Sequence, residues 1–235
     1  MTLLSVVQSV CEVVGVDSPT AVFGVLSYDR TMQEMLNLAN RMAQRIAYDD
    51  RDWSKFYKIV TYTGDGATEA FDFPVDYKRM MTTTQVWRST SNLSPMRFIN
   101  DFDDWMKRRS QNLYDPRGEW IRYGDQIHFA PVLSGTETAT HGYVHKNCIA
   151  LASGGFGDSF MSDADRFALD ERLLELGMIW QWKADKGAAY QEDLGTYQDA
   201  LNRIGGADKP APILIGRVPI SATSQASYPW PAPTP

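Results

Sequence analysis

The sequence has 235 residues, 43% of them hydrophobic, which is enough apolar material for one or two packed domains. Its 23 Lys and Arg residues and 29 Asp and Glu residues give a net charge of −6. This charge disfavours nonspecific binding to nucleic acid through long-range electrostatic attraction. Apolar runs such as 211–215 are far shorter than the roughly 20 residues of a membrane-spanning helix, and residues 1–15 lack the basic start of a secretion signal. Two cysteines, Cys11 and Cys148, are too few for a disulfide framework or a four-cysteine zinc site. We therefore expect a soluble, non-secreted protein of a reducing cytoplasm.

Two amphipathic helices are predicted before residue 52. Apolar residues from Leu3 to Val14 share one helical face, and Gly15 is placed to end this helix. Asp29 is a candidate N-cap for a second helix, which runs to about Tyr48 with apolar residues at intervals of three and four. Both helices therefore have one face suited to a core.

Alternation and turn residues replace the helical pattern in residues 53–152. Residues 57–62 alternate, and Gly64-Asp65-Gly66 predicts a tight hairpin that joins them to 69–73. A short helix is expected within 100–110, because Asn100 or Asp101 can cap it and acidic residues precede basic ones. The further predicted strands are 85–88, 96–99, 119–123, 126–130 and 140–146, the third and fourth joined at Gly124-Asp125. We expect a mostly antiparallel sheet with one small helix.

A glycine- and serine-rich stretch, 153–159, predicts a hinge before the helical pattern returns. Ser162 is a candidate N-cap of a long helix, and a second helix beyond Gly187 is expected to close at Gly205-Gly206. The apolar stripe of this pair is broad, which indicates more than one packing partner and favours contact with a neighbouring copy. The residues expected at this subunit contact are Leu169, Leu173, Leu176, Trp180, Trp182 and Tyr190.

Residues 207–235 predict an extended arm. Seven of the 12 prolines lie between Pro210 and Pro235, and this density prevents helix and interior-sheet pairing. Large apolar side chains are interleaved with the prolines, which favours an arm that docks on a partner over a flexible tail or an arm folded back on its own domain. The residues expected to dock are Pro210, Ile213, Leu214, Ile215, Val218, Ile220, Tyr228 and Trp230.

The sequence offers only weak signals for catalysis or metal binding. His141 and His145 lie four apart on a predicted strand, about 13 Å by strand rise, so they and His128 are better explained as sheet residues than as zinc ligands. The acidic cluster at 101–104 fits a helix start better than a calcium loop, and Cys148 beside His145 has no orienting acid. No phosphate loop or nucleophile elbow is present. We therefore predict no catalytic residues, no metal and no cofactor.

The C-terminal helical pattern resembles the helical core of the head-to-tail adaptor proteins of tailed bacteriophages, also called connector or head-completion proteins. The resemblance lies in the stretch 169–183 with its Trp180-Gln181-Trp182-Lys183 motif, then Gly187 and Tyr190 followed by Leu194. The segments 71–77 and 124–129 are similar to strands of the inserted β part of those proteins. The order of predicted elements is similar as well.

The resemblance implies an α+β protein with an α-helical bundle core, formed by the N-terminal helices (1–52) and the hinge and C-terminal helices (153–206). An antiparallel β region (53–152) is inserted into this core, and an extended arm (207–235) follows it. In the family such a chain is not an enzyme but one subunit of a ring, usually of twelve copies.

The partners implied by the resemblance are the portal protein, which the arm would bind, neighbouring copies of the chain, and tail or neck proteins. The ring would line the DNA exit channel without sequence-specific contacts, and the negative net charge suits passage of DNA. The implied location is the neck of the virion, after assembly in the host cytoplasm and with no membrane contact.

Two alternatives stay open at the level of sequence. One is another ring-forming neck or tail component, such as a tail terminator. The other is a tail-associated glycan-binding module or hydrolase that uses the aromatic residues of the β region, since 12% of the chain is aromatic. The sequence leaves open the ring order, the tail type, the host, the residues that line the channel and the direction in which the β region points.

Overall fold

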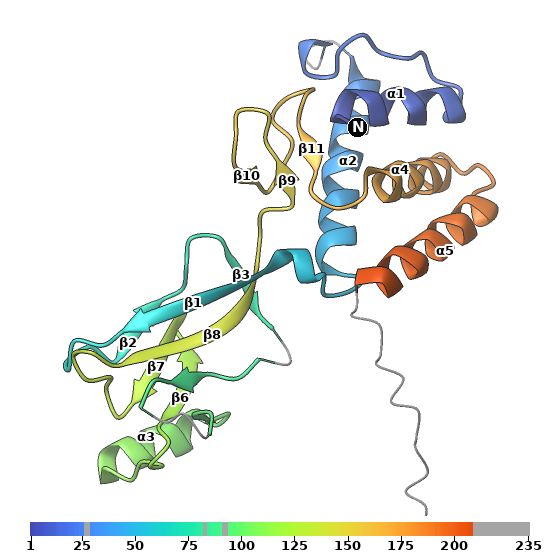
Figure 1. The fold of residues 1–235 in the computed structure, drawn as a ribbon. Coiled ribbons are helices and arrows are strands. Elements are labelled where there is room, and N and C mark those ends of the chain that lie inside the picture. The colour runs from blue at the N-terminus through green and yellow to red at the C-terminus, as the bar shows by residue number, and fades with distance from the viewer. Residues whose placement is uncertain (26–28, 82–83, 91–93, 209–235) are drawn as a thin grey trace, which may run out of the picture.

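The computed structural model describes residues 1–25, 29–81, 84–90 and 94–208, and over these residues the chain is an α+β protein. Figure 1 shows two lobes. We call the part with α1, α2, α4 and α5 the helical lobe, which also carries the short strands β9–β11. The part with β1–β8 and α3 is the β lobe.

The four helices of the helical lobe are α1 (Leu3–Val14), α2 (Arg30–Tyr48), α4 (Glu171–Asp185) and α5 (Gln191–Asp208). The two predicted N-terminal helices are confirmed, the first with its predicted end and the second with its predicted start. Gly15 ends α1 in the left-handed conformation with φ 74°, which glycine adopts without strain. The Asp29 side chain accepts hydrogen bonds from the backbone N–H groups of Thr31 and Met32 and so caps α2.

One core holds the helical lobe together, with α4 in contact with α1, α2 and α5. Met35 and Ile46 of α2 and Leu173 and Met178 of α4 are fully buried in it. Each such side chain stabilises the fold by about 1.5–3 kcal/mol through its removal from water. Among the described residues, no helix combines the length and the hydrophobicity needed to cross a membrane.

The β lobe contains two four-stranded sheets. The first is formed by β1 (Tyr57–Thr63), β3 (Tyr77–Met80), β4 (Trp87–Arg88) and β8 (Thr138–His145), and the second by β2 (Ala70–Asp72), β5 (Arg97–Phe98), β6 (Glu119–Tyr123) and β7 (Gln126–Ala130). The predicted β6–β7 hairpin is confirmed, with Gly124 and Asp125 both at positive φ in its turn. The predicted short helix is confirmed as α3 (Phe102–Gln111), capped by Asp101.

The predicted hairpin between residues 57–62 and 69–73 is wrong. Strand β1 pairs with β8 and strand β2 pairs with β7, so the two segments belong to different sheets. The reason lies at Gly64, whose N–H donates to the Glu137 carbonyl, and a Cβ at this position would lie 2.4 Å from Leu133. The turn is therefore packed against the loop that enters β8, and this contact directs the chain away from β1.

The predicted helix start at Ser162 is also wrong, and the hinge predicted at 153–159 stays a prediction. Short strands β9 (Ile149–Ala150), β10 (Phe156–Gly157) and β11 (Arg166–Phe167) form a small sheet across this region. The Asp165 carboxylate, 1% exposed, accepts hydrogen bonds from the backbone N–H groups of Ala152, Met161 and Ser162. This buried carboxylate organises the loop, and α4 begins only after its cap at Asp170.

The prediction that the last helix closes at Gly205-Gly206 is wrong, because α5 continues to Asp208. Gly205 is buried, and a Cβ there would overlap the guanidinium group of Arg51. The same guanidinium donates to Asn202 at 3.3 Å. The glycine is thus explained by the close approach of Arg51 rather than by a helix end.

Candidate interaction surfaces

The predicted subunit-contact residues pack largely within their own chain. Leu173, Trp180 and Trp182 are buried, and the Trp180 ring lies between the Arg45 guanidinium, at 5.1 Å, and the ring of Tyr197, at 6.1 Å. The other three are half-buried against the same core, and they are Leu169, Leu176 and Tyr190, of which Leu169 precedes α4. Contact of their remaining surface with a neighbouring copy stays a prediction.

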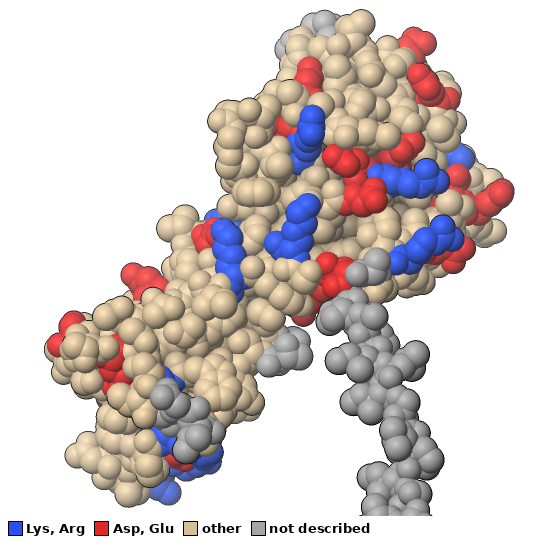
Figure 2. Space-filling model, viewed as in Figure 1, with Lys and Arg blue, Asp and Glu red and all other residues tan. Residues whose placement is uncertain are grey.

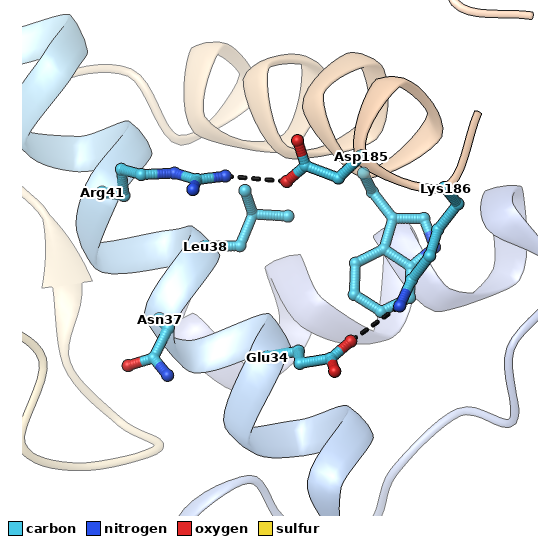
Figure 3. A pocket seen from close by; sticks show the side chains of 7 residues that line it. Glu34, Asn37, Leu38, Arg41, Asp185 and Lys186 are labelled. Carbon is cyan, nitrogen blue, oxygen red and sulfur yellow. Dashed lines mark hydrogen bonds and ion pairs between the residues drawn. The ribbon is translucent and has the colours of Figure 1, made fainter. Parts of the chain in front are cut away.

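A groove of about 350 Å³ separates α2 from the end of α4 (Figure 3). Two ion pairs bridge it, Arg41 to Asp185 at 2.8 Å and Lys186 to Glu34 at 2.7 Å, and Leu38 lies between them. The hydrogen bond from Lys186 lowers the pKa of the Glu34 carboxyl, which keeps it charged. The groove therefore offers a partner both signs of charge at fixed positions on the helical lobe.

No pattern in the sequence predicts this groove. Its paired residues are 144 and 152 positions apart, so no helical spacing connects them. In Figure 2, acidic and basic side chains lie close together on the helical lobe, and fewer are visible on the β lobe from this side.

The first sheet of the β lobe has an exposed, uncharged face. Tyr57, Ile59 and Thr61 of β1 lie on one side by their register with β8, and Trp87 of β4 pairs with Thr140 beside them. Ile59 is 75% exposed and Trp87 is 45% exposed. These side chains help to line a groove of about 440 Å³. The alternation in 57–62 predicted this strand, yet it did not say which face meets water.

Gly142 of β8 shapes the same groove. A Cβ at this position would lie 2.7 Å from the sulfur of Met81, so only glycine lets the Met81 side chain cross the sheet here. The Gly142 N–H donates to the Thr84 hydroxyl at 3.0 Å, which fixes the chain that follows β3. The groove is therefore an ordered feature of the sheet.

A second group of apolar side chains is exposed around α3. Phe102 and Met106 are one turn apart on the helix, and each is about half exposed, as is Phe98 of β5. The Phe98 ring packs on Trp120 at 4.6 Å between centroids, which fixes its position. The β lobe thus presents ordered apolar side chains at two places.

The three histidines make separate contacts, and the Cys148 thiol is buried. Burial lowers the pKa of His128, His141 and His145, and their contacts are separate: His128 stacks on Tyr123 at 3.7 Å, while His141 lies 3.5 Å from the Tyr62 hydroxyl. Burial raises the pKa of the Cys148 thiol to about 11, which makes it a poor nucleophile. Within the described ranges, no three His, Cys, Asp or Glu residues are grouped as metal ligands would be. The acidic cluster caps α3 and pairs with Arg108, as its helix-start interpretation predicts.

The last described residue of α5 fixes the point from which the predicted arm departs. The Asp208 carboxylate accepts hydrogen bonds from Ser54, at 2.8 Å from its N–H and at 2.6 Å from its hydroxyl. Ser54 opens the 3-10 turn η2 (Ser54–Phe56) that leads into β1. The predicted docking residues of the arm, Pro210 to Trp230, lie outside the described residues.

Comparison with known proteins identifies the chain. Residues 1–216 match the family model described as SU10 adaptor protein, a match that includes both lobes. No curated protein matches the sequence. The family predicted from the C-terminal helical pattern is confirmed: the chain belongs to the SU10 adaptor protein family, a family of phage head-to-tail adaptors.

Proposed function

We propose that the chain is one subunit of a ring, of twelve copies as the family resemblance implies, that lies beneath the portal of a tailed phage and joins capsid to tail. The observation that carries this proposal is the family match over both lobes. Membership implies a structural role in the virion and partners among portal and tail proteins, rather than an enzymatic activity. The proposal assigns different partners to the two lobes.

The helical lobe forms the ring in this proposal, with the helices of 1–52 and 153–206 as a bundle. Support comes from the groove between α2 and α4, where Arg41 and Lys186 lie beside Asp185 and Glu34. Alternating charges at a contact select the partner orientation more than they add affinity. The half-buried Leu176 and Tyr190 would add apolar area next to this polar surface.

The β lobe faces tail or neck proteins in this proposal. Its exposed apolar side chains, among them Ile59, Trp87 and Phe102, support this assignment. A contiguous apolar surface on a folded protein marks an interaction site, and aromatic residues supply much of the binding free energy at protein interfaces. Fewer large apolar side chains are exposed on the described part of the helical lobe, so the two lobes suit different partners.

The arm binds the portal in this proposal, with Ile213 to Ile220 extended and Tyr228 and Trp230 as anchors. The departure point at Asp208 supports it, because residues beyond α5 begin at the surface of the helical lobe. Docking of the arm on the portal would bring free subunits together there, so that the ring assembles on the portal. Genomic DNA passes the ring without sequence-specific contacts, which the net charge of −6 favours.

Truncation after Asp208 tests the arm. This end is chosen because α5 continues to Asp208, so that removal of 209–235 leaves the helix and its contact with Ser54 intact. The truncated subunit is expected to fold and to fail to co-sediment with tailless capsids. A matched full-length variant, Tyr228→Ala with Trp230→Ala, should bind more weakly than the wild type, whereas Ser224→Ala should bind normally. Unchanged capsid binding by the truncated subunit would contradict portal docking by the arm.

A further inference from the structure

Strand β1 lies at an edge of its sheet. The strand order is β1-β8-β3, and β1 pairs with β8 over all seven residues from Tyr57 to Thr63. Within the described part of the chain, no strand pairs with its outer edge. The outer edge of such a strand presents backbone N–H and C=O groups that can accept another strand.

The edge carries one charged residue, Lys58, as protection against unwanted pairing. Proteins guard long edge strands with charges, prolines or bulges, yet the exposed face of β1 carries Tyr57, Ile59 and Thr61. The charged residue of the strand, Lys58, lies on the opposite face and is paired with Asp76 at 2.6 Å. An edge strand of seven residues with these properties can pair with another chain unless a further segment protects it.

The C-terminal segment of the same chain is a candidate to protect the outer edge of β1. Asp208, at the end of α5, is hydrogen-bonded to Ser54, three residues before β1 begins. Figure 1 shows the end of α5 beside the start of β1. The 27 residues of 209–235 therefore start next to the first residue of the open edge.

One segment of the arm has the length and composition of a strand. Residues 213–218 read Ile-Leu-Ile-Gly-Arg-Val and are bounded by Pro212 and Pro219. At about 3.3 Å per residue these six residues span roughly 20 Å, close to the roughly 23 Å of β1. The four residues from 209 to 212 reach up to about 13 Å, and they follow Asp208, whose contact Ser54 lies three residues before β1. Prolines at both ends are compatible with an edge strand and stop it from extending further.

We infer that residues 213–218 add to the outer edge of β1 in the free subunit, parallel to β1 and within the same chain. Ile213 and Ile215 then lie on one face of the sheet and Leu214 on the other, where both faces of β1 carry apolar neighbours such as Ile59 and Val60. This contact prevents β1 from pairing with another copy. In the proposed assembly, on which this last step rests, the portal competes with β1 for the same arm.

Amide hydrogen exchange of the purified full-length subunit tests the inference. The double variant Leu214→Pro with Gly216→Pro removes two N–H groups from the segment and cannot form the strand. We expect the outward-facing amides of β1 to exchange at least about tenfold faster in this variant than in the wild type. Ser224→Pro, outside the segment, is the matched control and should exchange as the wild type does. The amides of α4 report whether each variant is folded.

Equal exchange of β1 in the wild type and in the double variant would overturn the inference. A dilution series identifies the source of the arm, because protection by the same chain is independent of concentration. Protection that disappears on dilution would show that the arm comes from a second copy and would overturn the assignment within one chain. The portal is absent from this experiment, so its result is independent of capsid binding by the truncated subunit.

Discussion

The two lobes bury their apolar residues to different degrees. In the helical lobe one core joins residues from Leu3 to Phe56 with residues from Val144 to Leu201, and ion pairs close its surface between α2 and α4. In the β lobe two smaller cores lie apart, one around Phe129 and one around Trp105. Most of the large apolar side chains that remain exposed among the described residues belong to the β lobe.

This difference in exposure supports the proposal that the β lobe binds partners through its exposed apolar side chains. A side chain buried in a contiguous core contributes to the free energy of unfolding, whereas an exposed one gains burial only when a partner covers it. Substitution of a buried side chain should therefore lower stability, whereas substitution of an exposed apolar side chain should mainly weaken binding.

The largest effect is expected for Leu173→Ala in α4. Leu173 is 0% exposed, so the substitution leaves a cavity in the core and should lower the free energy of unfolding by about 2–5 kcal/mol. The matched change Leu113→Ala in the β lobe, where the side chain is 58% exposed, should alter it by less than about 0.5 kcal/mol. Urea unfolding of both variants measures the difference, and equal losses would contradict the greater contribution assigned to the buried side chain.

A smaller effect is expected for Glu137→Gln in the β lobe. The Glu137 carboxylate is buried, and it accepts hydrogen bonds from Arg88, at 2.6 Å from Nη2, and from Thr90 and the Ser134 backbone. Loss of its charge leaves the Arg88 guanidinium, 10% exposed, without its counter-ion, at a cost of about 2–3 kcal/mol.

The pH dependence of Glu137 sharpens this prediction. Hydrogen bonding from Arg88 lowers the pKa of the carboxyl from 4.5 to about 2. Because the folded-state pKa is the lower one, this stabilisation is present above pH 4.5 and is lost as the pH falls from 4.5 towards 2. The stability difference between wild type and Glu137→Gln should therefore shrink in that range, and a constant difference would show that the carboxylate does not titrate in this way.

A still smaller effect on stability is expected for the ion pair between Arg41 and Asp185. Both side chains are about half exposed, so Arg41→Ala should lower the free energy of unfolding by less than about 1 kcal/mol. If the groove contributes to the subunit contact, as proposed, Arg41→Ala should weaken ring formation on the portal. The double variant Arg41→Asp with Asp185→Arg exchanges the two charges and should restore part of the ring formation. Light scattering of subunit and portal mixtures measures this, with Arg117→Ala, at an exposed ion pair of the β lobe, as control.

The smallest effect on stability is expected for Ile59→Ser. The side chain is 75% exposed, so the free energy of unfolding should change by less than about 0.5 kcal/mol. Attachment of tails to capsids carrying this variant should nevertheless decrease, because the substitution removes apolar area from the proposed tail-facing surface. Normal tail attachment by Ile59→Ser and by Trp87→Ser would contradict the proposed role of the β lobe.

The sequence predicted those features that depend on neighbouring residues. Gly15, Asp29 and Asp101 each act within one turn of their own helix, so local patterns sufficed to place α1, α2 and α3. The β6–β7 hairpin was predicted for the same reason, since its turn and both strands are adjacent in the chain.

The features that were not predicted depend on distant contacts. Nothing in residues 57–63 says that their partner is β8, some 80 residues later. The start of α4 is set by hydrogen bonds that Asp165 receives from Ala152 and its other neighbours, and Gly205 is explained by Arg51. The groove between α2 and α4 likewise requires both helices to be in place.

Cryo-electron microscopy of the protein in its native particle tests the central claim most directly. The account predicts a ring of this chain beneath the portal, with the helical lobes in contact around the ring and the β lobes directed to the tail. Density for residues 209–235 is expected on portal subunits in that assembled state. A ring at another place in the tail, or β lobes that form the contacts between subunits, would contradict the proposed division between the lobes.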